Sequence, residues 1–319
     1  MSWQPTATAT ALKCRAAMLQ SARTFFATRE VLEVETPILS AGAVSDPHIE
    51  SLSTQVAGVV GARYLCTSPE YAMKRLLAAG SGDIYQVCKV FRDEERGRWH
   101  NPEFTMIEWY RLGFDDAALM AEVEALLRQL LAPHRTLRPA EHLSYQAALQ
   151  RHAQIDPFNA SERELLQAAA RHEIRCDAEL DRDAKLDLLM GLIVGPRLGR
   201  EAPCFIYDYP ASQAALARLK PGSPSVAARF ELYLDGLELA NGFHELVQPK
   251  EQRARFNQDL AIRGARGQIQ PPLDENLLAA LEAGMPDCAG VALGFDRLVA
   301  IALRSEKLAD AMAFSFDNA

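Results

Sequence analysis

The chain has 319 residues, 49% of them hydrophobic, which is enough for one large domain or two ordinary ones. Its 34 basic and 42 acidic residues give a net charge of −8, which argues against a nucleic-acid partner unless basic residues gather locally. Six widely spaced cysteines without a Cys-x-x-Cys pair argue against structural zinc, and the lack of a signal peptide or long apolar run predicts a cytoplasmic protein without a membrane span.

The first predicted elements are a helix and a short extended segment. Ala-rich residues 7–28 carry apolar side chains at roughly helical spacing after the possible caps Thr6 and Thr10. Residues 31–37 follow as an extended segment that ends at a proline. A short strand is predicted within residues 63–70, before a further helical stretch.

Residues 90–110 are predicted to form two strands joined by a polar loop. Since strand side chains alternate with period two, one face of the second strand carries Phe104, Met106, Glu108 and Tyr110. An aromatic ring, a carboxylate and a phenol on one face suit a ligand with a flat ring and a cationic end. In the loop, Arg92 is a fixed cation suited to phosphate and Glu94 can accept a hydrogen bond from an exocyclic amine. Taken alone, the same pattern also fits a salt-bridged hairpin.

The middle of the chain is mainly helical in pattern. Residues 115–131 are amphipathic, and residues 140–202 hold three further helical patterns, one of which opens with a capping box at 161–164. A buried strand is predicted at 204–210. No side-chain pattern in residues 115–202 indicates chemistry.

A hairpin is predicted at residues 229–246, because Asp235 and Gly236 lie between two alternating runs. Glu238 and Glu245, seven residues apart across a glycine, could converge as oxygen ligands of a hard divalent cation. Such a pair is equally typical of a solvated surface. Residues 251–266 are predicted to form a charged helix with a solvated face.

The last pattern is a strand, a glycine and a helix start at residues 290–298. Together with the earlier segments it resembles the class II aminoacyl-tRNA synthetases: residues 7–37 resemble their motif 1, residues 90–110 motif 2 and residues 290–298 motif 3. His-Asn-Pro-Glu-Phe-Thr at 100–105 is similar to the lysyl branch of that family. The resemblance runs from about residue 10 to the C-terminus.

The resemblance implies an α+β fold: a six- or seven-stranded antiparallel sheet flanked by helices, with a helical insertion at about 115–202. It also implies a homodimer across motif 1. The residues that precede motif 1 are too few for an additional domain. We therefore expect residues 1–319 to be a single catalytic domain without an anticodon-binding domain.

The resemblance also implies roles for individual residues. Arg92 and Arg297 would be catalytic, holding the α- and γ-phosphates of ATP. The residues implied to bind ATP are Arg92, Asp93, Glu94, His100, Asn101, Phe104, Glu238, Leu239, Gly294 and Arg297. Those implied to bind the amino-acid substrate are Ser68, Pro69, Glu70, Glu108, Tyr110, Glu245 and Ala292, and Mg²⁺ would be held by Glu238 and Glu245. Two local alternatives stay open, since Glu70 could cap a helix and His100 could satisfy the hydrogen bonds of its loop.

Three positions depart from the lysyl-tRNA synthetase pattern: Ser68 replaces alanine, Trp99 replaces arginine and Ala292 replaces glycine. These departures resemble the short paralogues of that enzyme. Those paralogues use ATP and Mg²⁺ to activate (R)-β-lysine and transfer it to a lysine of elongation factor P. Ser68 and Ala292 would lie where α- and β-amino acids differ, and a single methyl group can exclude a substrate shape.

Two other functions stay open. A truncated enzyme could charge tRNA or make a small amide, which an exposed basic surface beside the site would favour. A catalytically inactive paralogue could serve as a regulatory binding subunit. The second is disfavoured because the implied phosphate and metal groups are all present, namely Arg92, Glu94, Glu238, Glu245 and Arg297.

Overall fold

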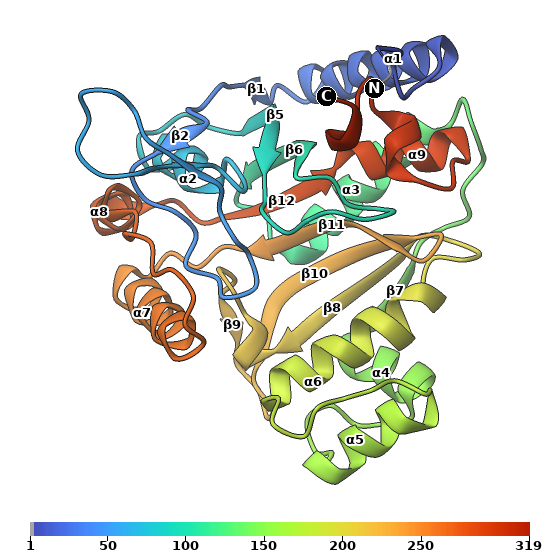
Figure 1. Cartoon of the computed structure of the whole chain (residues 1–319), viewed down its shortest axis with the longest axis vertical. Helices are drawn as coiled ribbons and strands as arrows, with labels where there is room; N and C mark the ends of the chain where they lie inside the picture. Colours follow the sequence, from blue (N-terminus) through green and yellow to red (C-terminus); the bar gives the residue numbers. More distant parts are fainter. Residues whose placement is uncertain (1–2) are drawn as a thin grey trace.

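A mixed sheet runs through the computed structural model, which describes residues 3–319 (Figure 1). Its strand order is β1-β5-β6-β12-β11-β10-β8-β7, with β9 paired to β10. The strands are β1 (Leu32–Glu33), β5 (Ile84–Phe91), β6 (Glu103–Leu112), β12 (Cys288–Gly294), β11 (Leu237–His244), β10 (Val226–Leu234), β9 (Leu219–Lys220), β8 (Cys204–Pro210) and β7 (Glu141–Ser144). The strands from β5 to β8 are antiparallel, as predicted, but the sheet has nine strands within the described residues rather than six or seven, because β1 and β7 add parallel edges and β9 adds a short pair.

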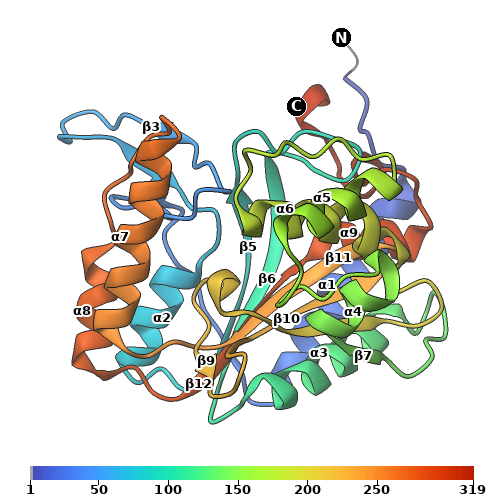
Figure 2. The ribbon, with the colours of Figure 1, turned by 90° about the horizontal axis from the view of Figure 1, so that it is seen from below.

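Helices surround this sheet in three groups (Figures 1 and 2). The first group packs on one face of the sheet: α1 (Ala9–Ala27), α3 (Asp116–Leu131) and α9 (Phe295–Leu303). The second consists of α2 (Glu70–Ala78), α7 (Pro249–Ala265) and α8 (Glu275–Gly284). The third consists of α4 (Tyr145–Ala153), α5 (Glu162–Arg171) and α6 (Arg182–Leu189). A small second sheet joins β2 (Leu39–Ser40), β4 (Arg63–Leu65) and β3 (Ser53–Thr54).

The three central strands β6, β12 and β11 have one apolar and one mainly polar face, because side chains alternate along a strand. The face toward α1, α3 and α9 carries fully buried side chains, among them Ile107, Trp109, Val291 and Leu293. On the other face the register aligns Ala292 with Glu108 and Asn241, and Gly290 with Tyr110 and Phe243. This second face is left free by the first helix group and becomes the floor of a pocket.

The structure confirms most of the predicted elements and corrects some of their details. The N-cap of α1 is Thr8, whose side chain accepts a hydrogen bond from Ala11 N at 3.2 Å, rather than Thr6 or Thr10. The β10–β11 turn has positive φ angles at Asp235 and Gly236, as a tight hairpin requires. Helix α8 was not predicted, and neither was strand β7, which has only four residues.

The charged helix α7 differs from its prediction in one respect. Arg263 is only 2% exposed and does not lie on a solvated face. Its guanidinium donates to the carbonyls of Asp46 and Ile49 and to the Glu50 carboxylate. Helix α7 therefore anchors the loop that contains residues 46–50.

Two separate cores underlie the helical middle of the chain. Helix α3 packs with the main core, whereas α4, α5 and α6 surround a second cluster of buried side chains. The capping box at Ser161 and Glu164 is formed. The reading of residues 115–202 as an insertion stays a prediction. No helix within residues 3–319 combines the length and apolarity that crossing a membrane demands.

Candidate active site

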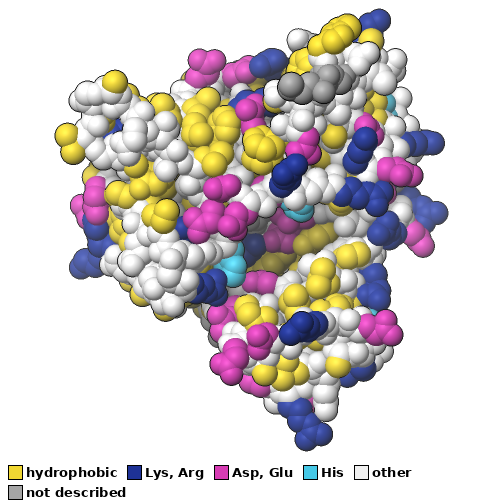
Figure 3. Space-filling model, viewed as in Figure 1, with side chains coloured by type: hydrophobic (Ala, Val, Ile, Leu, Met, Phe, Trp, Pro, Cys, Tyr) yellow, Lys and Arg dark blue, Asp and Glu magenta, His cyan; other side chains and the backbone are white. Residues whose placement is uncertain are grey.

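A pocket of about 680 Å³ lies over the polar face of the sheet, large enough for a nucleotide-sized ligand. Its floor comes from β6, β11 and β12, and its walls come from the loop of residues 44–49, from α6 and α7, and from residues 211–216. Figure 3 shows the hollow in the middle of this face, with acidic side chains and a histidine at its rim. The predicted site residues that line it are Ser68, Glu70, Arg92, His100, Asn101, Phe104, Glu108, Tyr110, Glu238, Leu239, Glu245, Ala292, Gly294 and Arg297.

Three predicted residues are absent from the lining: Pro69, Asp93 and Glu94. Asp93 and Glu94 are exposed in the loop between β5 and β6, where Glu94 adopts a left-handed φ of 64°. The next residue, Glu95, lines the pocket instead. A turn reverses the chain here, so a sequence pattern cannot tell which of two adjacent glutamates points inward.

Two arginines define what we call the arginine end of the pocket. The Arg92 guanidinium lies 5.2 Å from the centre of the Phe104 ring and 3.9 Å from the Glu95 carboxylate. Arg297, near the start of α9, donates to the carbonyl of Glu238 at 2.8 Å. Burial lowers the pKa of Arg92, but a guanidinium stays protonated at every pH at which the protein is folded. Two fixed cations on one wall make an anion-binding site.

His100 joins this end of the pocket through Arg297. The Arg297 Nη2 atom lies 2.8 Å from His100 Nε2, and the Glu95 carboxylate lies 3.4 Å from the same nitrogen. Burial and the charge of Arg297 both lower the pKa of His100, so the neutral ring accepts a hydrogen bond from the guanidinium. His100 therefore holds Arg297 and also lines the pocket, and both predicted alternatives for it stay open.

Glu238 completes the arginine end. Burial, with the charge of Glu231, raises its pKa to about 7, against the opposing charges of three arginines, Arg297, Arg229 and Arg92. Its carboxylate makes no hydrogen bond or ion pair with any residue that the structure describes. A half-buried carboxylate that makes no hydrogen bond and lines a pocket can bind a cation.

Three carboxylates and one lysine define the carboxylate end: Glu70, Glu108, Glu245 and Lys74. Lys74 Nζ lies 2.6 Å from Glu70 Oε1 and 2.6 Å from Glu245 Oε2. Burial alone would lower the pKa of Lys74, but these two carboxylates raise it. Glu70 is thus held as an acceptor rather than as a helix cap, since the cap position of α2 belongs to Pro69.

Glu108 has a different set of partners. It accepts hydrogen bonds from the Tyr110 hydroxyl at 2.7 Å and from the Ser68 hydroxyl at 2.8 Å. Burial raises the pKa of Glu108 and of Glu245 to about 8, and the charge of Glu70 adds to both shifts. With all three carboxylates ionised, this end would carry two negative charges more than Lys74 neutralises.

Gly290 lets this end close tightly. A Cβ atom at position 290 would lie 2.2 Å from a ring carbon of Tyr110 and 2.6 Å from Glu245 Oε1. No real side chain fits at such distances. Two positions along β12, the methyl group of Ala292 is tolerated and faces the pocket between Glu108 and Asn241.

The structure does not bring Glu238 and Glu245 together. They lie at opposite ends of β11, and seven residues of extended strand span roughly 20 Å. The strand keeps its register at Gly242, which pairs with Phe230 on one side and Val291 on the other, and its one register shift with β10 is a bulge between Glu238 and Ala240. Within residues 3–319 no three His, Cys, Asp or Glu side chains form a metal-ligand cluster. A shared two-carboxylate metal site is therefore not formed.

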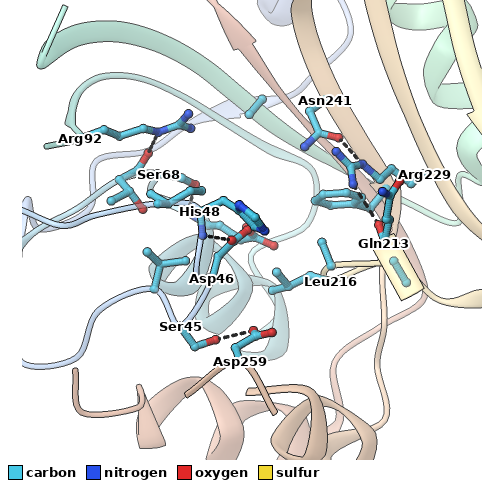
Figure 4. Close-up of a pocket in the computed structure, with 18 of the residues that line it drawn as sticks. Ser45, Asp46, His48, Ser68, Arg92, Gln213, Leu216, Arg229, Asn241 and Asp259 are labelled. Atoms are coloured by element: carbon cyan, nitrogen blue, oxygen red, sulfur yellow. Dashed lines mark hydrogen bonds between the residues drawn. The ribbon is translucent and has the colours of Figure 1, made fainter. Parts of the chain in front are cut away.

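The sequence analysis missed four residues that shape the pocket: Lys74, Glu95, Arg229 and Asn241. Arg229 donates to Asn241 Oδ1 at 3.2 Å and to Glu231 Oε1 at 2.6 Å, and Figure 4 shows it with Asn241 across the cavity from Arg92. Two sequence signals were available. Glu70 and Lys74 stand at the i, i+4 spacing of a helical ion pair, and Arg229 and Glu231 at the i, i+2 spacing of one strand face.

A family model and the most similar curated proteins agree on the family of this chain. Residues 1–318 match the family described as tRNA synthetases class II (D, K and N). Curated proteins named elongation factor P–(R)-β-lysine ligase, from Salmonella arizonae, Salmonella dublin and Salmonella heidelberg, are each 52% identical to the chain over 324 residues. Each match covers 100% of this chain and 98% of the relative.

Proposed function

The chain belongs to the class II tRNA synthetases of the D, K and N type, and on that premise we propose that it is an ATP-dependent ligase that attaches (R)-β-lysine to elongation factor P. The relatives named for this reaction align along nearly their whole length. One observation carries the proposal within the structure: a single pocket has an arginine end and a carboxylate end over one floor. An aminoacyl adenylate of a diamino acid has the complementary layout.

The charge at the carboxylate end supports a substrate with two amines. (R)-β-Lysine has two ammonium groups, and the three carboxylates exceed Lys74 by two charges when ionised. We assign Glu108, with Tyr110, to the side-chain ammonium and Glu70 and Glu245 to the other amine. Ammonium groups would lower the raised pKa values of Glu108 and Glu245 and so favour their ionised forms.

The arginine end supports the activation step. The substrate carboxylate attacks the α-phosphorus of ATP in line, and pyrophosphate leaves. Arg92 would lie between the carboxylate and the phosphate, where it offsets their repulsion and orients them. Arg297, near the start of α9, would hold the γ-phosphate.

Mg²⁺ fits one residue of this end. Mg²⁺ keeps several waters and needs only one or two protein carboxylates beside the phosphates. Glu238 lines the pocket, has no described partner and has a raised pKa, which suits it to such a ligand. When bound, the ion supplies positive charge to the phosphates. Glu245 is held by Lys74, and its support as a metal ligand is correspondingly weak.

The acceptor amine then attacks the acyl adenylate and AMP leaves.

A truncated synthetase acting on tRNA is the second candidate. The pocket mouth argues against it, because its acids outnumber its bases: Asp46, Asp181, Asp183, Asp187, Glu251 and Asp259 against His48, Arg255 and Arg266. An acidic mouth repels a phosphate backbone and attracts a protein lysine.

The same proposal extends to assembly and compartment. A homodimer across α1 and β1 is supported by exposed apolar side chains in and just after β1, with Leu32 at 55%, Ile38 at 39% and Leu39 at 43%. The six cysteines are free thiols, which suits a reducing cytoplasm. We keep residues 1–319 as one catalytic domain, with residues 115–202 as its helical insertion.

The test is the intact mass of elongation factor P after incubation with this protein, ATP, Mg²⁺ and (R)-β-lysine. We expect a gain of one lysyl group that is lost with Arg92→Ala. No gain, while pyrophosphate exchange shows that the adenylate forms, would contradict the acceptor and move the search to tRNA or a small amine.

A further inference from the structure

The transfer step raises a chemical question that the two ends of the pocket do not answer. A lysine ammonium has an ordinary pKa near 10.4, so it must lose a proton before its nitrogen can attack. Arginines cannot accept that proton. The carboxylates of the second end already hold Lys74 and the hydroxyls of Tyr110 and Ser68.

His48 stands at the pocket mouth with an unused imidazole. It lines the pocket and is exposed, and no side-chain hydrogen bond joins its ring to a residue in the described part of the chain. Its backbone N–H donates to Asp46 Oδ1 at 2.8 Å. Figure 4 shows the ring in the cavity, between the side that carries Arg92 and the side that carries Arg229.

The backbone around His48 is firmly anchored although the ring is free. Ser45 Oγ donates to Asp259 Oδ2 at 2.8 Å. Arg263 holds Asp46, Ile49 and Glu50 at 2.9, 3.2 and 2.6 Å. These anchors on both sides of position 48 hold the backbone that carries the imidazole at the mouth of the pocket.

Carboxylates face His48 from three elements: Asp46 on its own loop, Asp187 on α6 and Asp259 on α7. Burial raises the pKa of Asp187 to about 6 and also raises that of Asp259, and a charged His48 lowers both. Arg255 and Arg266 also line this part of the pocket.

On the basis of the proposed function, we propose that His48 is the general base that deprotonates the acceptor lysine in the transfer step. The imidazole takes one proton from the ammonium and gives it to solvent. The freed nitrogen lone pair forms the C–N bond, the bond from the carbonyl carbon to the phosphate oxygen breaks, and AMP leaves with that electron pair. The second proton lost by the nitrogen follows the same route. An imidazole nitrogen can accept a proton and release it again, which is the chemistry that this step needs.

The experiment separates the two half-reactions. Enzyme is loaded with the adenylate and mixed with elongation factor P, and the transfer rate is followed by intact mass at pH 6 to 10. Pyrophosphate exchange is measured in parallel. We expect His48→Gln to slow transfer by about 100-fold at pH 7 and to leave exchange within about 3-fold of the wild-type rate. His172→Gln, a histidine at the end of α5, is the matched control and should change neither.

Two further readouts distinguish a base from a structural role. The deficit of His48→Gln should shrink toward pH 10, where the acceptor deprotonates unaided. Free imidazole should restore part of the rate to His48→Gly. A deficit that is equal at every pH and insensitive to imidazole, or an equal loss of exchange, would overturn the proposal. Transfer by His48→Gln at the wild-type rate would overturn the role of His48 alone, whereas absent transfer by the wild type overturns the proposed function and this inference with it.

Discussion

The arginine end and the carboxylate end of the pocket share one floor but hold their charge in different ways. Arg92 and Arg297 remain protonated at any pH of interest, so their charge exists before a ligand arrives. Glu108 and Glu245 have pKa values of about 8, so their charge depends on the arrival of a cation. One end is preorganised for an anion, and the other takes on its full charge only with its ligand.

The origin of each end explains the difference. Arg92 follows β5 in a loop, and Arg297 lies in the first turn of α9 at the edge of the cavity. Glu108 projects from the middle of β6 and is 2% exposed, and Glu245 is 1% exposed just after β11. Deep burial raises a carboxylate pKa because the charged form loses its water. The contrast can be tested from either end.

Arg92→Ala should have the largest effect, since it removes half of the preorganised charge. We expect ATP–pyrophosphate exchange to fall about 1000-fold, in line with the loss of one key electrostatic contact to the transition state. Arg96→Ala is the control, because Arg96 lies in the same loop and is exposed. Exchange within 10-fold of the wild-type rate would contradict the role assigned to Arg92.

Lys74→Met should remove the positive charge that neutralises the carboxylate end. It leaves Glu70 and Glu245 without their shared cation, and we expect a loss of about 3 kcal/mol in the free energy of unfolding at pH 8. The loss should be smaller at pH 6, where Glu245 binds a proton instead. Denaturant titration measures both values. Lys89→Met, a half-exposed lysine on β5, should change stability by less than about 0.5 kcal/mol, and an equal effect of the two variants would refute the argument.

Glu108→Gln should weaken the binding of (R)-β-lysine without weakening the binding of ATP. We expect KM for (R)-β-lysine to rise about 50-fold, the size of a lost hydrogen bond to a charged group, while KM for ATP changes by less than about 3-fold. Glu103→Gln, on the same strand but exposed, provides the comparison. A parallel rise in both KM values would mean that the two ends do not act separately.

The pH dependence of the free energy of unfolding should show that Glu108 and Glu245 are protonated in the ligand-free protein. In the ligand-free protein Glu108 and Glu245 hold protons up to about pH 8, whereas in the unfolded chain a glutamate releases its proton near pH 4.3. The contribution of these two groups to stability is therefore fully present below about pH 4 and is lost as pH rises from about 5 to 8, by up to about 1.4 kcal/mol per pH unit for each proton held. Guanidinium unfolding across this range tests it, and Glu108→Gln should flatten the profile. A stability that rises with pH would exclude this account.

Ala292→Gly should have the smallest effect. It tests how the pocket distinguishes α-lysine from (R)-β-lysine. Removing the methyl group between Glu108 and Asn241 should shift the kcat/KM ratio toward α-lysine by about 10-fold. Ala289→Gly, on the opposite face of β12, should leave the ratio unchanged. An unaltered ratio for Ala292→Gly would mean that another residue discriminates between the two lysines.

Local pattern predicted those features of the site that depend on local geometry. Phe104, Met106, Glu108 and Tyr110 all line the pocket, because strand alternation needs no knowledge of the rest of the fold. The fold class followed from the resemblance to a known family, and the comparisons support it.

Features that depend on long-range packing were missed. Glu238 and Glu245 were predicted to converge, but they lie at opposite ends of a strand that keeps its register with both neighbours at Gly242. Lys74 was not singled out, because its link to Glu245 crosses most of the chain. His48 lies in a loop without periodicity, and its place over the pocket depends on Arg263 more than two hundred residues later.

The crowding at Gly290 sets a limit on how this enzyme could be remodelled. Any side chain at position 290 would place its Cβ atom against a Tyr110 ring carbon and a Glu245 oxygen, so this position does not tolerate substitution. A library built for new amino-acid substrates should therefore leave position 290 constant and vary its neighbour on the same face, Ala292. Changes at position 292 would then alter the substrate range by one small group at a time. The carboxylate end, which we propose binds the amines, would keep its shape.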